Sequence, residues 1–388
     1  MARYGITNVA IVGAGFSGSV IAHTLAQYGI RADVFDIRDH VAGNCHTSRD
    51  PDTNVMVHTY GPHIFHTSNK RVWDFIQQFD TFMPFINRVK AHARGQVYSL
   101  PINLFTINQL FGKQFNPRQA EAFIGSIAQN DIVEPRTFEE QALRFVGREI
   151  YETFFRGYTR KQWGLEPSEL PASILKRLPL RFNYDDNYYT SDYQGIPKNG
   201  YTHIIERMLD HDNISVHLST MFTRDMACDY GHIFYSGPID AWYGHPEGRL
   251  GYRTLDFEIL RSEGDLQGNA VINYCDENTP WTRIAEHKHF APWEKHDKTI
   301  GYREYSRICG PEDTPYYPIR LLDDKTLLAR YVAMANEESN VTFTGRLGTY
   351  RYLDMHVTIA EALDVAEQFL KAHESKIDMP SFCIDPLA

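Results

Sequence analysis

Residues 8–26, Asn-Val-Ala-Ile-Val-Gly-Ala-Gly-Phe-Ser-Gly-Ser-Val-Ile-Ala-His-Thr-Leu-Ala, decide the fold of this chain. An apolar strand, a glycine turn and an apolar helix follow one another directly. We expect Gly13 to adopt a backbone conformation that a Cβ atom disfavours, and Gly15 to let the main chain approach a pyrophosphate. Gly18 would let the helix pack closely on the strand. The phosphates would then lie at the helix N-terminus, where free amides and the macrodipole favour negative charge.

A second strand, residues 32–36 (Ala-Asp-Val-Phe-Asp), follows the helix and ends in Asp36. Its carboxylate stands about 20 residues beyond the glycines, where dinucleotide-binding folds carry a ribose-binding acid. This order of elements predicts an adenine dinucleotide, with a tight turn that binds no ligand as the alternative. Residues 42–43, Ala-Gly, replace a glycine pair that turns over the diphosphate in many FAD enzymes. This favours FAD, although a plain loop after the strand would explain the segment as well.

Composition narrows the class of protein. The 388 residues, 43% of them hydrophobic, suffice for two or three hydrophobic cores. No apolar run approaches the ~20 residues of a membrane span, so we expect a soluble chain. The net charge of −10 argues against nucleic-acid binding, which needs a basic face. The five cysteines are scattered and never form a Cys-x-x-Cys pair, which indicates reduced thiols in a cytoplasmic protein.

The pattern of elements predicts a mixed α/β fold with a discontinuous Rossmann-like domain. Strand-and-helix patterns in residues 1–80, 190–245 and 338–388 are assigned to a domain that binds FAD. Residues 81–189 have apolar positions at helical spacing, and Thr137 with Glu140 has the form of a capping box, so a helical domain is expected there. Recurring strand-like segments in residues 246–337 predict an antiparallel sheet.

The last predicted helix begins after Asp354, which is a good N-cap residue. In flavoproteins of this layout, a late helix directs its N-terminus at the N1 and O2 edge of the isoalloxazine. Free amides and the macrodipole would there favour the anionic reduced ring. The alternative is that Asp354 only caps the helix, and the two roles do not exclude each other.

Several sequence blocks point to one family. They are residues 61–67 (Gly-Pro-His-Ile-Phe-His-Thr), 100–103 (Leu-Pro-Ile-Asn), 158–164 (Tyr-Thr-Arg-Lys-Gln-Trp-Gly), 177–182 (Arg-Leu-Pro-Leu-Arg-Phe), 185–189 (Asp-Asp-Asn-Tyr-Tyr), 282–290 (Thr-Arg-Ile-Ala-Glu-His-Lys-His-Phe) and 345–355 (Gly-Arg-Leu-Gly-Thr-Tyr-Arg-Tyr-Leu-Asp-Met). In order and at matching spacing, these blocks resemble the bacterial UDP-galactopyranose mutases, and the resemblance runs from about residue 8 to 370.

The resemblance implies an isomerase that interconverts UDP-galactopyranose and UDP-galactofuranose and supplies furanose units for surface polysaccharide. In the family, N5 of reduced FAD attacks the anomeric carbon and displaces UDP, and the covalent adduct allows the ring to open and reclose. The resemblance also implies a mobile lid on the helical domain and a homodimer. The flavin reductant is not identified, since no second dinucleotide motif marks a site for one.

The same resemblance implies roles for individual residues. Arg177 on the lid and Arg283 on the sheet domain would contact the pyrophosphate, for which arginine forks are natural partners. The loop with His63 would lie against the flavin. Predicted substrate-binding residues are Phe154, Tyr158, Trp163, Tyr188, Asn273, Tyr317 and Tyr352. Predicted cofactor-binding residues are Gly13, Gly15, Ser17, Gly18, Asp36, Asn44, His63, Arg346, Asp354 and Met355.

Alternative interpretations remain at this point. A surface ion pair is the common fate of any single arginine, and Phe154 could equally pack in a core. The histidines at 63, 66, 287 and 289 lack a carboxylate at helical spacing, so no metal is predicted. An amine-oxidase-like flavin enzyme would share the FAD motifs, and a non-catalytic sensor of FAD or nucleotide sugars would share the binding site. UDP-N-acetylgalactosamine stays open as an additional substrate.

Overall fold

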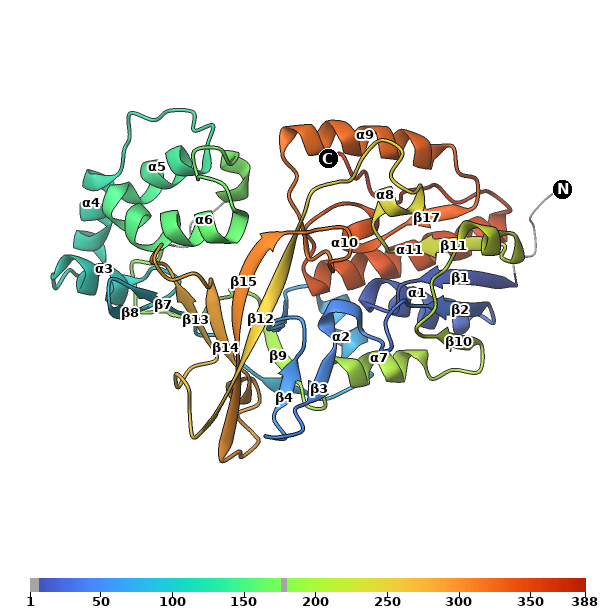
Figure 1. Cartoon of the computed structure of the whole chain (residues 1–388), viewed down its shortest axis with the longest axis horizontal. Helices are drawn as coiled ribbons and strands as arrows, with labels where there is room; N and C mark the ends of the chain where they lie inside the picture. The colour runs from blue at the N-terminus through green and yellow to red at the C-terminus, as the bar shows by residue number, and fades with distance from the viewer. Residues whose placement is uncertain (1–6, 176–179) are drawn as a thin grey trace.

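The computed structural model describes residues 7–175 and 180–388 and has three parts (Figure 1). A parallel sheet with its helices lies at the right of the view, a group of helices at the left, and two long strands, β12 and β15, between them. The parallel sheet has five strands. In spatial order these are β10 (Ile214–His217), β2 (Arg31–Phe35), β1 (Asn8–Val12), β11 (His232–Tyr235) and β17 (Val341–Phe343).

Both faces of this sheet are covered, as expected for parallel strands. Successive strand residues point to opposite faces, so Ile11 joins the core under α1 (Phe16–Ala26), α7 (Tyr201–Leu209) and α11 (Met355–Ser375). The neighbouring Ala10 joins the opposite core, which includes residues of α8 (Ile239–Trp242) and α9 (Leu322–Asn336). The sequence therefore correctly predicted a discontinuous Rossmann-like sheet.

A seven-stranded sheet forms the second part. In spatial order its strands are β16 (Tyr317–Pro318), β12 (Tyr252–Glu263), β15 (Lys298–Ile308), β14 (Arg283–Glu286), β13 (Val271–Tyr274), β7 (Lys90–Ala93) and β8 (Gln96–Ser99). All neighbours are antiparallel except β13 and β7, which run parallel. The pairs among strands of residues 246–337 are antiparallel, as predicted, and the sheet becomes mixed only where β7, from an earlier segment of the chain, joins β13.

The helical part contains α3 (Leu104–Phe111), α4 (Pro117–Ile127), α5 (Phe138–Ile150), the π-helical turn η2 (Tyr151–Arg156) and α6 (Gly157–Trp163). The predicted capping box is present, because Thr137 accepts from the Glu140 amide and the Glu140 carboxylate accepts in return. Gly147 has a φ of 72° inside α5 and marks a kink there. The predicted strands and helices of the other parts are likewise present within a few residues of their expected bounds.

Shorter elements connect these parts. Two small sheets pair β3 (Thr47–Arg49) with β4 (Met56–His58), and β5 (Phe65–Thr67) with β9 (Tyr193–Pro197) and β6 (Phe82–Pro84). The remaining helical turns are η1 (Gly43–Cys45), α2 (Lys70–Ile76), η3 (Ala172–Leu175), η4 (Arg224–Asp229), η5 (His287–Phe290) and α10 (Gly345–Gly348). Within the described ranges, no helix is long and apolar enough to cross a bilayer.

Two stretches differ from the predicted segmentation. Strands β6, β7 and β8 lie within residues 81–189, the predicted helical segment, but they pair with strands of the sheets. Helix α9 lies within residues 246–337, the predicted sheet segment, yet Leu328 and Tyr331 pack in the core beside β11 and β17. In both cases tertiary pairing, which local patterns do not reveal, sets the assignment.

Candidate active site

The glycine turn has the geometry that the sequence predicted. Gly13 has a φ of 108°, and a Cβ there would lie 2.2 Å from the Ser236 hydroxyl oxygen. A Cβ on Gly18 would lie 2.0 Å from the Gly13 carbonyl oxygen, so α1 can approach β1 only with glycine at this position. Gly15 differs, because its φ is −82° and the nearest atom to a Cβ would be the Gly43 Cα at 3.9 Å. The fold therefore leaves space above Gly15 that a ligand could use.

Asp36, which was predicted to bind a ribose, makes hydrogen bonds within the glycine turn and the segment after it. Its carboxylate accepts hydrogen bonds from the Ala14 amide at 2.9 Å and from the Arg38 amide at 3.0 Å. The Arg38 guanidinium in turn donates to the Asn44 side-chain oxygen at 2.7 Å. The acid thus fixes the glycine turn. Sequence reasoning missed Arg38, although a basic residue two positions after the acid was a usable signal.

The segment after Asp36 contains a strained residue. Ala42 has a φ of 75°, in the left-handed region that favours glycine. The replacement of the first glycine of the pair by alanine therefore keeps the backbone turn and adds a buried methyl group. Gly43 follows with a φ of 53° and faces Gly15.

Arg346 lies among tyrosines at the edge of the parallel sheet. Its guanidinium donates to the backbone carbonyls of Tyr316 and Leu353. The same group lies 4.9 Å from the ring centroid of Tyr352 and 5.7 Å from that of Tyr317, and these two rings stack at 5.6 Å. The structure therefore brings together three predicted site residues from two segments of the chain.

Ser17 connects the glycine turn to this region. Its hydroxyl lies 3.1 Å from the Thr344 hydroxyl, and a Cβ on Gly345 would be 3.1 Å from the Ser17 Cβ. Ser17 is 6% exposed, so its hydroxyl is occupied inside the fold. The α1 N-terminus and the segment that carries Arg346 are thereby held side by side.

A cleft lies between the seven-stranded sheet, the helical part and the segment before α2. It is lined by Pro62, Ile64, Asn87, Val89, Tyr158, Tyr188, Tyr189, Val271, Asn273 and Arg283. Four residues of the predicted substrate site, Tyr158, Tyr188, Asn273 and Arg283, thus share one cleft. They come from α6, from the segment before β9, and from β13 and β14.

Asn87 is a lining residue that sequence reasoning missed. It is 3% exposed, and its side-chain oxygen has no hydrogen-bond partner. Its backbone carbonyl accepts from the Tyr188 amide at 2.9 Å. A buried acceptor without a partner is costly unless a ligand or water satisfies it, so Asn87 is a candidate ligand contact. A single asparagine outside a motif gave no signal in the sequence.

Arg283 is the cation of the cleft. It lies 2.9 Å from the Glu304 carboxylate, and the two side chains are 23% and 2% exposed. Burial alone would lower the pKa of this guanidinium, but Glu304 and the nearby phenols of Tyr158 and Tyr317 raise it above its ordinary value. Asn273 is the direct neighbour of Arg283 across β13 and β14. The cleft therefore holds a permanent positive charge at a fixed place.

Two predicted aromatic contacts lie deeper in the helical part. Phe154 is 4% exposed and packs edge-to-face on Tyr98 at 5.1 Å, inside the helical core. Trp163 is the last residue of α6 and is half-buried against the same core. Tyr158 is also half-buried, and burial raises the pKa of its phenol, so its hydroxyl is protonated at neutral pH. Of the three, Tyr158 alone lines the described cleft.

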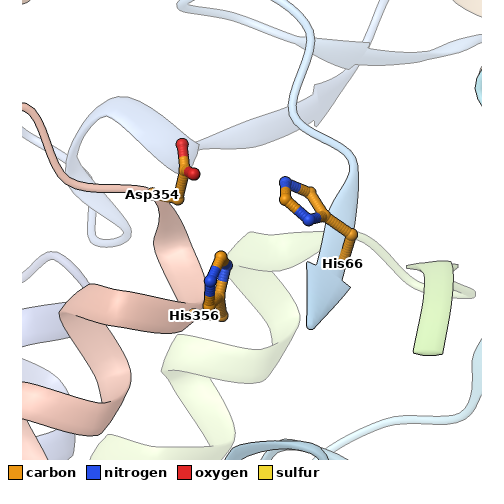
Figure 2. Close-up of side chains that lie close together, drawn as sticks. All are labelled: His66, Asp354 and His356. Atoms are coloured by element: carbon orange, nitrogen blue, oxygen red, sulfur yellow. The ribbon is translucent and has the colours of Figure 1, made fainter. Parts of the chain in front are cut away.

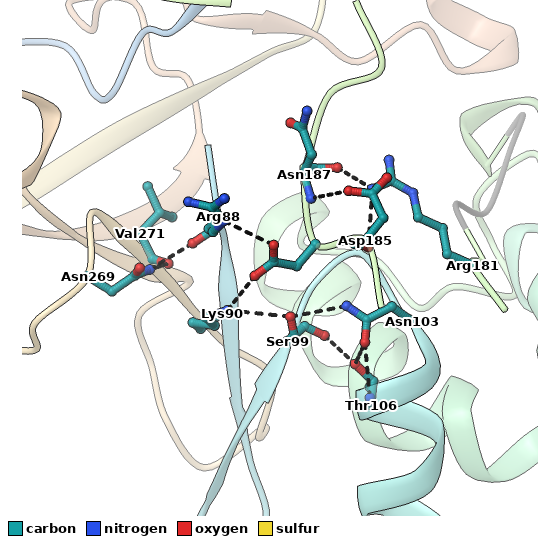
Figure 3. A network of polar contacts seen from close by, with 11 residues as sticks. Arg88, Lys90, Ser99, Asn103, Thr106, Arg181, Asp185, Asn187, Asn269 and Val271 are labelled. Atoms are coloured by element: carbon teal, nitrogen blue, oxygen red, sulfur yellow. Dashed lines mark hydrogen bonds and ion pairs between the residues drawn. The ribbon is translucent and has the colours of Figure 1, made fainter. Parts of the chain in front are cut away.

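A polar network fixes the segment that carries Tyr188 (Figure 3). Asp186 accepts from Arg88 at 3.0 Å and from the Lys90 ammonium at 3.2 Å. Arg181 donates to the Asp185 carboxylate at 2.9 Å and to the Asn187 carbonyl. Burial tends to raise the pKa of Asp186, but the two cations lower it overall. The acids of the 185–189 block are therefore structural anchors for this wall.

The loop with His63 is held from three sides. The His63 amide donates to the His58 ring at 2.9 Å, its own ring lies 2.8 Å from the Gly61 carbonyl, and its carbonyl accepts from the Tyr201 hydroxyl. Burial lowers the pKa of the His63 imidazole to about 4, with Arg346 and Arg283 acting in the same direction. The ring is therefore neutral at pH 7. Arg177 lies outside the described residues.

Asp354 lies at the N-cap position of α11, but its side chain makes no hydrogen bond to the first turn. It faces His66 from β5 and His356 from α11 (Figure 2), and their possible ligand atoms lie within 4.8 Å of one another. The His66 ring is stacked on Tyr189 at 3.8 Å and bonded to the Ser191 hydroxyl. Met355, the first residue of α11, is half-buried beside this group.

The described residues include two groups of His, Asp and Glu side chains that are close enough to bind a metal ion, and neither is a strong metal site. A helix N-terminus, such as that beside Asp354, disfavours a cation. In the second cluster, of Asp265, Glu286 and His289, Glu286 stands three residues before His289, so the expected lack of a carboxylate at helical spacing is wrong for this histidine. The Glu286 carboxylate, however, already accepts from three backbone amides and from Thr299. The Asp265 carboxylate is already paired with the Lys288 ammonium. The prediction that no metal is needed stays a prediction.

Comparison with known proteins places this cleft in a family. Residues 153–352 match the model of the UDP-galactopyranose mutase family, and residues 11–79 match that of NAD(P)-binding Rossmann-like domains. A probable UDP-galactopyranose mutase of Klebsiella pneumoniae is 58% identical over 97% of this chain and 98% of its own length. The chain belongs to the UDP-galactopyranose mutase family. It is therefore an isomerase, and the family resemblance read from the sequence is confirmed.

Other relatives show how wide this family is. A dTDP-fucopyranose mutase of Escherichia coli is 50% identical over 94% of this chain and 99% of its own length. A UDP-galactopyranose mutase of Mycoplasma pneumoniae is 31% identical over 93% and 96%. A crystal structure of a reduced UDP-galactopyranose mutase shares the fold, with a TM-score of 0.72, 14% identity and coverage of 94% and 96%. The fold prediction is thus confirmed, and one relative of this chain is named for another nucleotide sugar.

Proposed function

We propose that this chain interconverts UDP-galactopyranose and UDP-galactofuranose with bound, reduced FAD. The observation that carries the proposal is the placement of Arg283 in one cleft with Tyr158, Tyr188 and Asn273. A partly buried, permanently charged guanidinium among hydroxyl and amide groups suits an anionic ligand that also carries a base and a sugar.

The residues of the Rossmann-like part fit an FAD molecule. The space above Gly15, the facing Gly43 and the N-terminus of α1 would receive the diphosphate. Asp36 keeps free lone pairs for a ribose hydroxyl. The first turn of α11 lacks a side-chain cap and would face the flavin together with Arg346. Bound reduced FAD would supply the nucleophilic nitrogen that holds the anomeric carbon while the sugar ring opens and recloses.

The protein's own side chains would bind and orient the nucleotide sugar. Arg283 would hold the pyrophosphate and stabilise the negative charge that grows on it as UDP leaves, and Arg177 would add a second cation. Tyr158 would stack on the uracil, and the hydroxyls of Tyr317 and Tyr352 would reach the phosphates. Neutral His63 would keep its loop against the cofactor without adding a charge.

The finer assignments are part of this proposal. We infer a cytoplasmic homodimer that receives electrons from a separate reductant and supplies galactofuranose for a cell-surface polysaccharide. The support is the family membership together with the scattered free cysteines.

A second candidate substrate is dTDP-fucopyranose, which the 50% identical relative from Escherichia coli is named for. It would use the same ring contraction, because the two substrates share the leaving pyrophosphate and the 4-hydroxyl. They differ in a methyl group on the base, the ribose 2-hydroxyl and the sugar 6-hydroxyl.

The test is anaerobic incubation of the purified protein with UDP-galactofuranose and, separately, with dTDP-fucofuranose. Each is run with the flavin as isolated and after dithionite reduction, and the products are separated by chromatography. Conversion of the UDP sugar in the reduced sample alone supports the proposal. Faster conversion of the dTDP sugar would make dTDP-fucose, and not UDP-galactose, the substrate of this chain. If neither sugar nucleotide is converted although reduced FAD is bound, the amine-oxidase-like enzyme and the non-catalytic sensor become the favoured alternatives.

A further inference from the structure

Lys161 makes an unusual set of contacts between the helical part and the seven-stranded sheet. It projects from α6 into the loop that connects β13 and β14. Its ammonium donates to backbone carbonyls of that loop. The acceptors are Tyr274 at 2.7 Å, Asp276 at 2.9 Å, Thr279 at 2.9 Å and Trp281 at 3.0 Å. An ammonium has three N–H groups and no lone pair, so one cation satisfies a ring of carbonyls that no neutral side chain would.

The two elements that meet at Lys161 both carry walls of the cleft. Tyr158 lies on α6, one helical turn before Lys161. The loop begins directly after β13, which holds Asn273, and ends directly before Arg283 on β14. The contact is close, since a Cβ on Gly157 would lie 2.3 Å from the Cys275 carbonyl oxygen.

The C-terminal end of α6 is held to the same sheet. The Ser306 hydroxyl of β15 donates to the Gln162 carbonyl at 2.8 Å, and Arg253 of β12 donates to the Lys161 carbonyl at 3.4 Å. Helix α6 is therefore connected to the sheet at both ends, and the Lys161 ammonium makes four of these contacts.

We propose that Lys161 is a positioning residue of the active site: its ammonium holds α6 and the β13–β14 loop together and so sets the separation of Tyr158 and Arg283. The inference rests on the proposed function, in which these two residues bind the base and the pyrophosphate of one ligand. A ligand that spans both contacts binds tightly only when their separation matches its length, because a shift of about 1 Å can cost a large factor.

Surface contacts between the same elements cannot replace this anchor. Arg160 pairs with Glu277 at 3.4 Å, and both side chains are about half exposed. Such exposed pairs contribute roughly 0–1 kcal/mol. Without the ammonium, the loop carbonyls would lose their partly buried donor, and the loop would move toward water to satisfy them.

The anchor should also depend on pH. Burial lowers the pKa of the Lys161 ammonium to about 8, although Cys275, Asp276 and Glu277 raise it in part. Arg253 is the cation on the other side, and its guanidinium faces the Lys161 carbonyl. Above pH 8 the neutral amine would have one donor fewer and a lone pair directed at carbonyls. Positioning should therefore weaken as the pH rises through 8.

The experiment compares Lys161→Met with the wild-type holoenzyme by titration of UDP-galactose at pH 7, followed through the fluorescence of bound FAD. We expect the Kd and the KM to rise at least about tenfold while kcat and FAD content change much less. Lys113→Met, which removes the same charge from an exposed site after α3, is the control and should bind as the wild type does. An unchanged Kd in Lys161→Met would overturn the proposal.

Two further measurements apply even if Lys161→Met does not fold. The Kd of the wild type should rise as the pH goes from 7 to 9.5, and a flat profile contradicts the proposal. Butylammonium should restore UDP-galactose affinity to Lys161→Ala in a saturable manner. If the wild type binds no UDP-galactose at all, the proposed function has failed and not the role of Lys161.

Discussion

The guanidinium of Arg283 lies 2.9 Å from the Glu304 carboxylate, and Glu304 is almost fully buried while Arg283 still reaches the cleft. The carboxylate balances the arginine on one side, and the open side faces the ligand. Arg283→Ala should therefore lower kcat/KM at least about 100-fold by removing a charge-assisted contact to the pyrophosphate. FAD content, measured by absorbance after denaturation, should remain that of the wild type.

The matched control is Arg307→Ala on β15, where the arginine is half exposed and paired with Asp256 and Asp313. It should leave turnover within about twofold, because exposed ion pairs contribute little. Wild-type turnover by Arg283→Ala would show that the cation is only structural.

The same pair predicts a difference in stability. Glu304→Gln keeps the shape of the side chain but leaves the partly buried guanidinium of Arg283 without its counter-ion. The free energy of unfolding should fall by about 3 kcal/mol, the typical cost of breaking a buried pair from one side. Glu258→Gln removes the exposed partner of Arg303 and should cost less than about 1 kcal/mol. Urea unfolding measures the free energy of unfolding of both variants. Equal losses in Glu304→Gln and Glu258→Gln would contradict the stronger contribution of the Arg283–Glu304 pair.

Gly15→Ala separates a ligand requirement from a folding requirement. The φ of Gly15 suits alanine, and among the described residues beyond its chain neighbours the nearest atom to the added methyl group is the Gly43 Cα at 3.9 Å. We expect a folded protein that purifies without FAD, since the methyl group would occupy the place of the diphosphate. Gly125→Ala on the exposed face of α4 should keep its FAD and gain up to about 1 kcal/mol of stability. Full FAD content in Gly15→Ala would place the cofactor elsewhere.

Buried histidines predict a loss of stability in acid. Burial lowers the pKa of His63 to about 4, that of His287 to about 3, and that of His58 well below its ordinary value. The unfolded chain keeps a histidine pKa of about 6.5, so it binds more protons than the fold below that pH. The free energy of unfolding should therefore fall as the pH drops from about 6.5 toward 4.

Urea unfolding at several pH values tests this acid dependence. His287→Asn keeps an acceptor for the His58 amide but does not titrate, so its stability should fall less steeply between pH 6.5 and 4.5. An unchanged slope would mean that other groups cause the acid sensitivity.

The sequence predicted best what local chemistry determines. Gly18 could be assigned because a Cβ there is excluded by Gly13 and Ile11 of the same strand–turn–helix unit, and Gly13 because the turn requires its φ of 108°. The Thr137 cap could be read because its partner lies three residues away. In each case the interacting groups are neighbours in the chain, where spacing is informative.

Long-range pairing explains what the sequence missed. Strand β7 joins β13 although about 180 residues separate them, and no local pattern encodes such pairing. Asn87 and Lys161 gain their significance only from the segments that fold around them. For Phe154 the sequence left a substrate contact and core packing open; the structure shows the side chain packed in the helical core, and the substrate contact stays a prediction.

The uncapped start of α11 gives the last prediction. Asp354 makes no hydrogen bond to the first turn, so Asp354→Asn should hardly change the thermal stability. If the first turn of α11 faces the flavin, the Asp354 carboxylate opposes the negative charge of the reduced ring, and its removal should raise the reduction potential of bound FAD. Asp364→Asn, on an exposed face of the same helix and paired with Arg71, should leave the potential unchanged. Dye-coupled reduction measures the potentials. Equal reduction potentials for the two variants and the wild type would show that Asp354 does not lie close to the flavin.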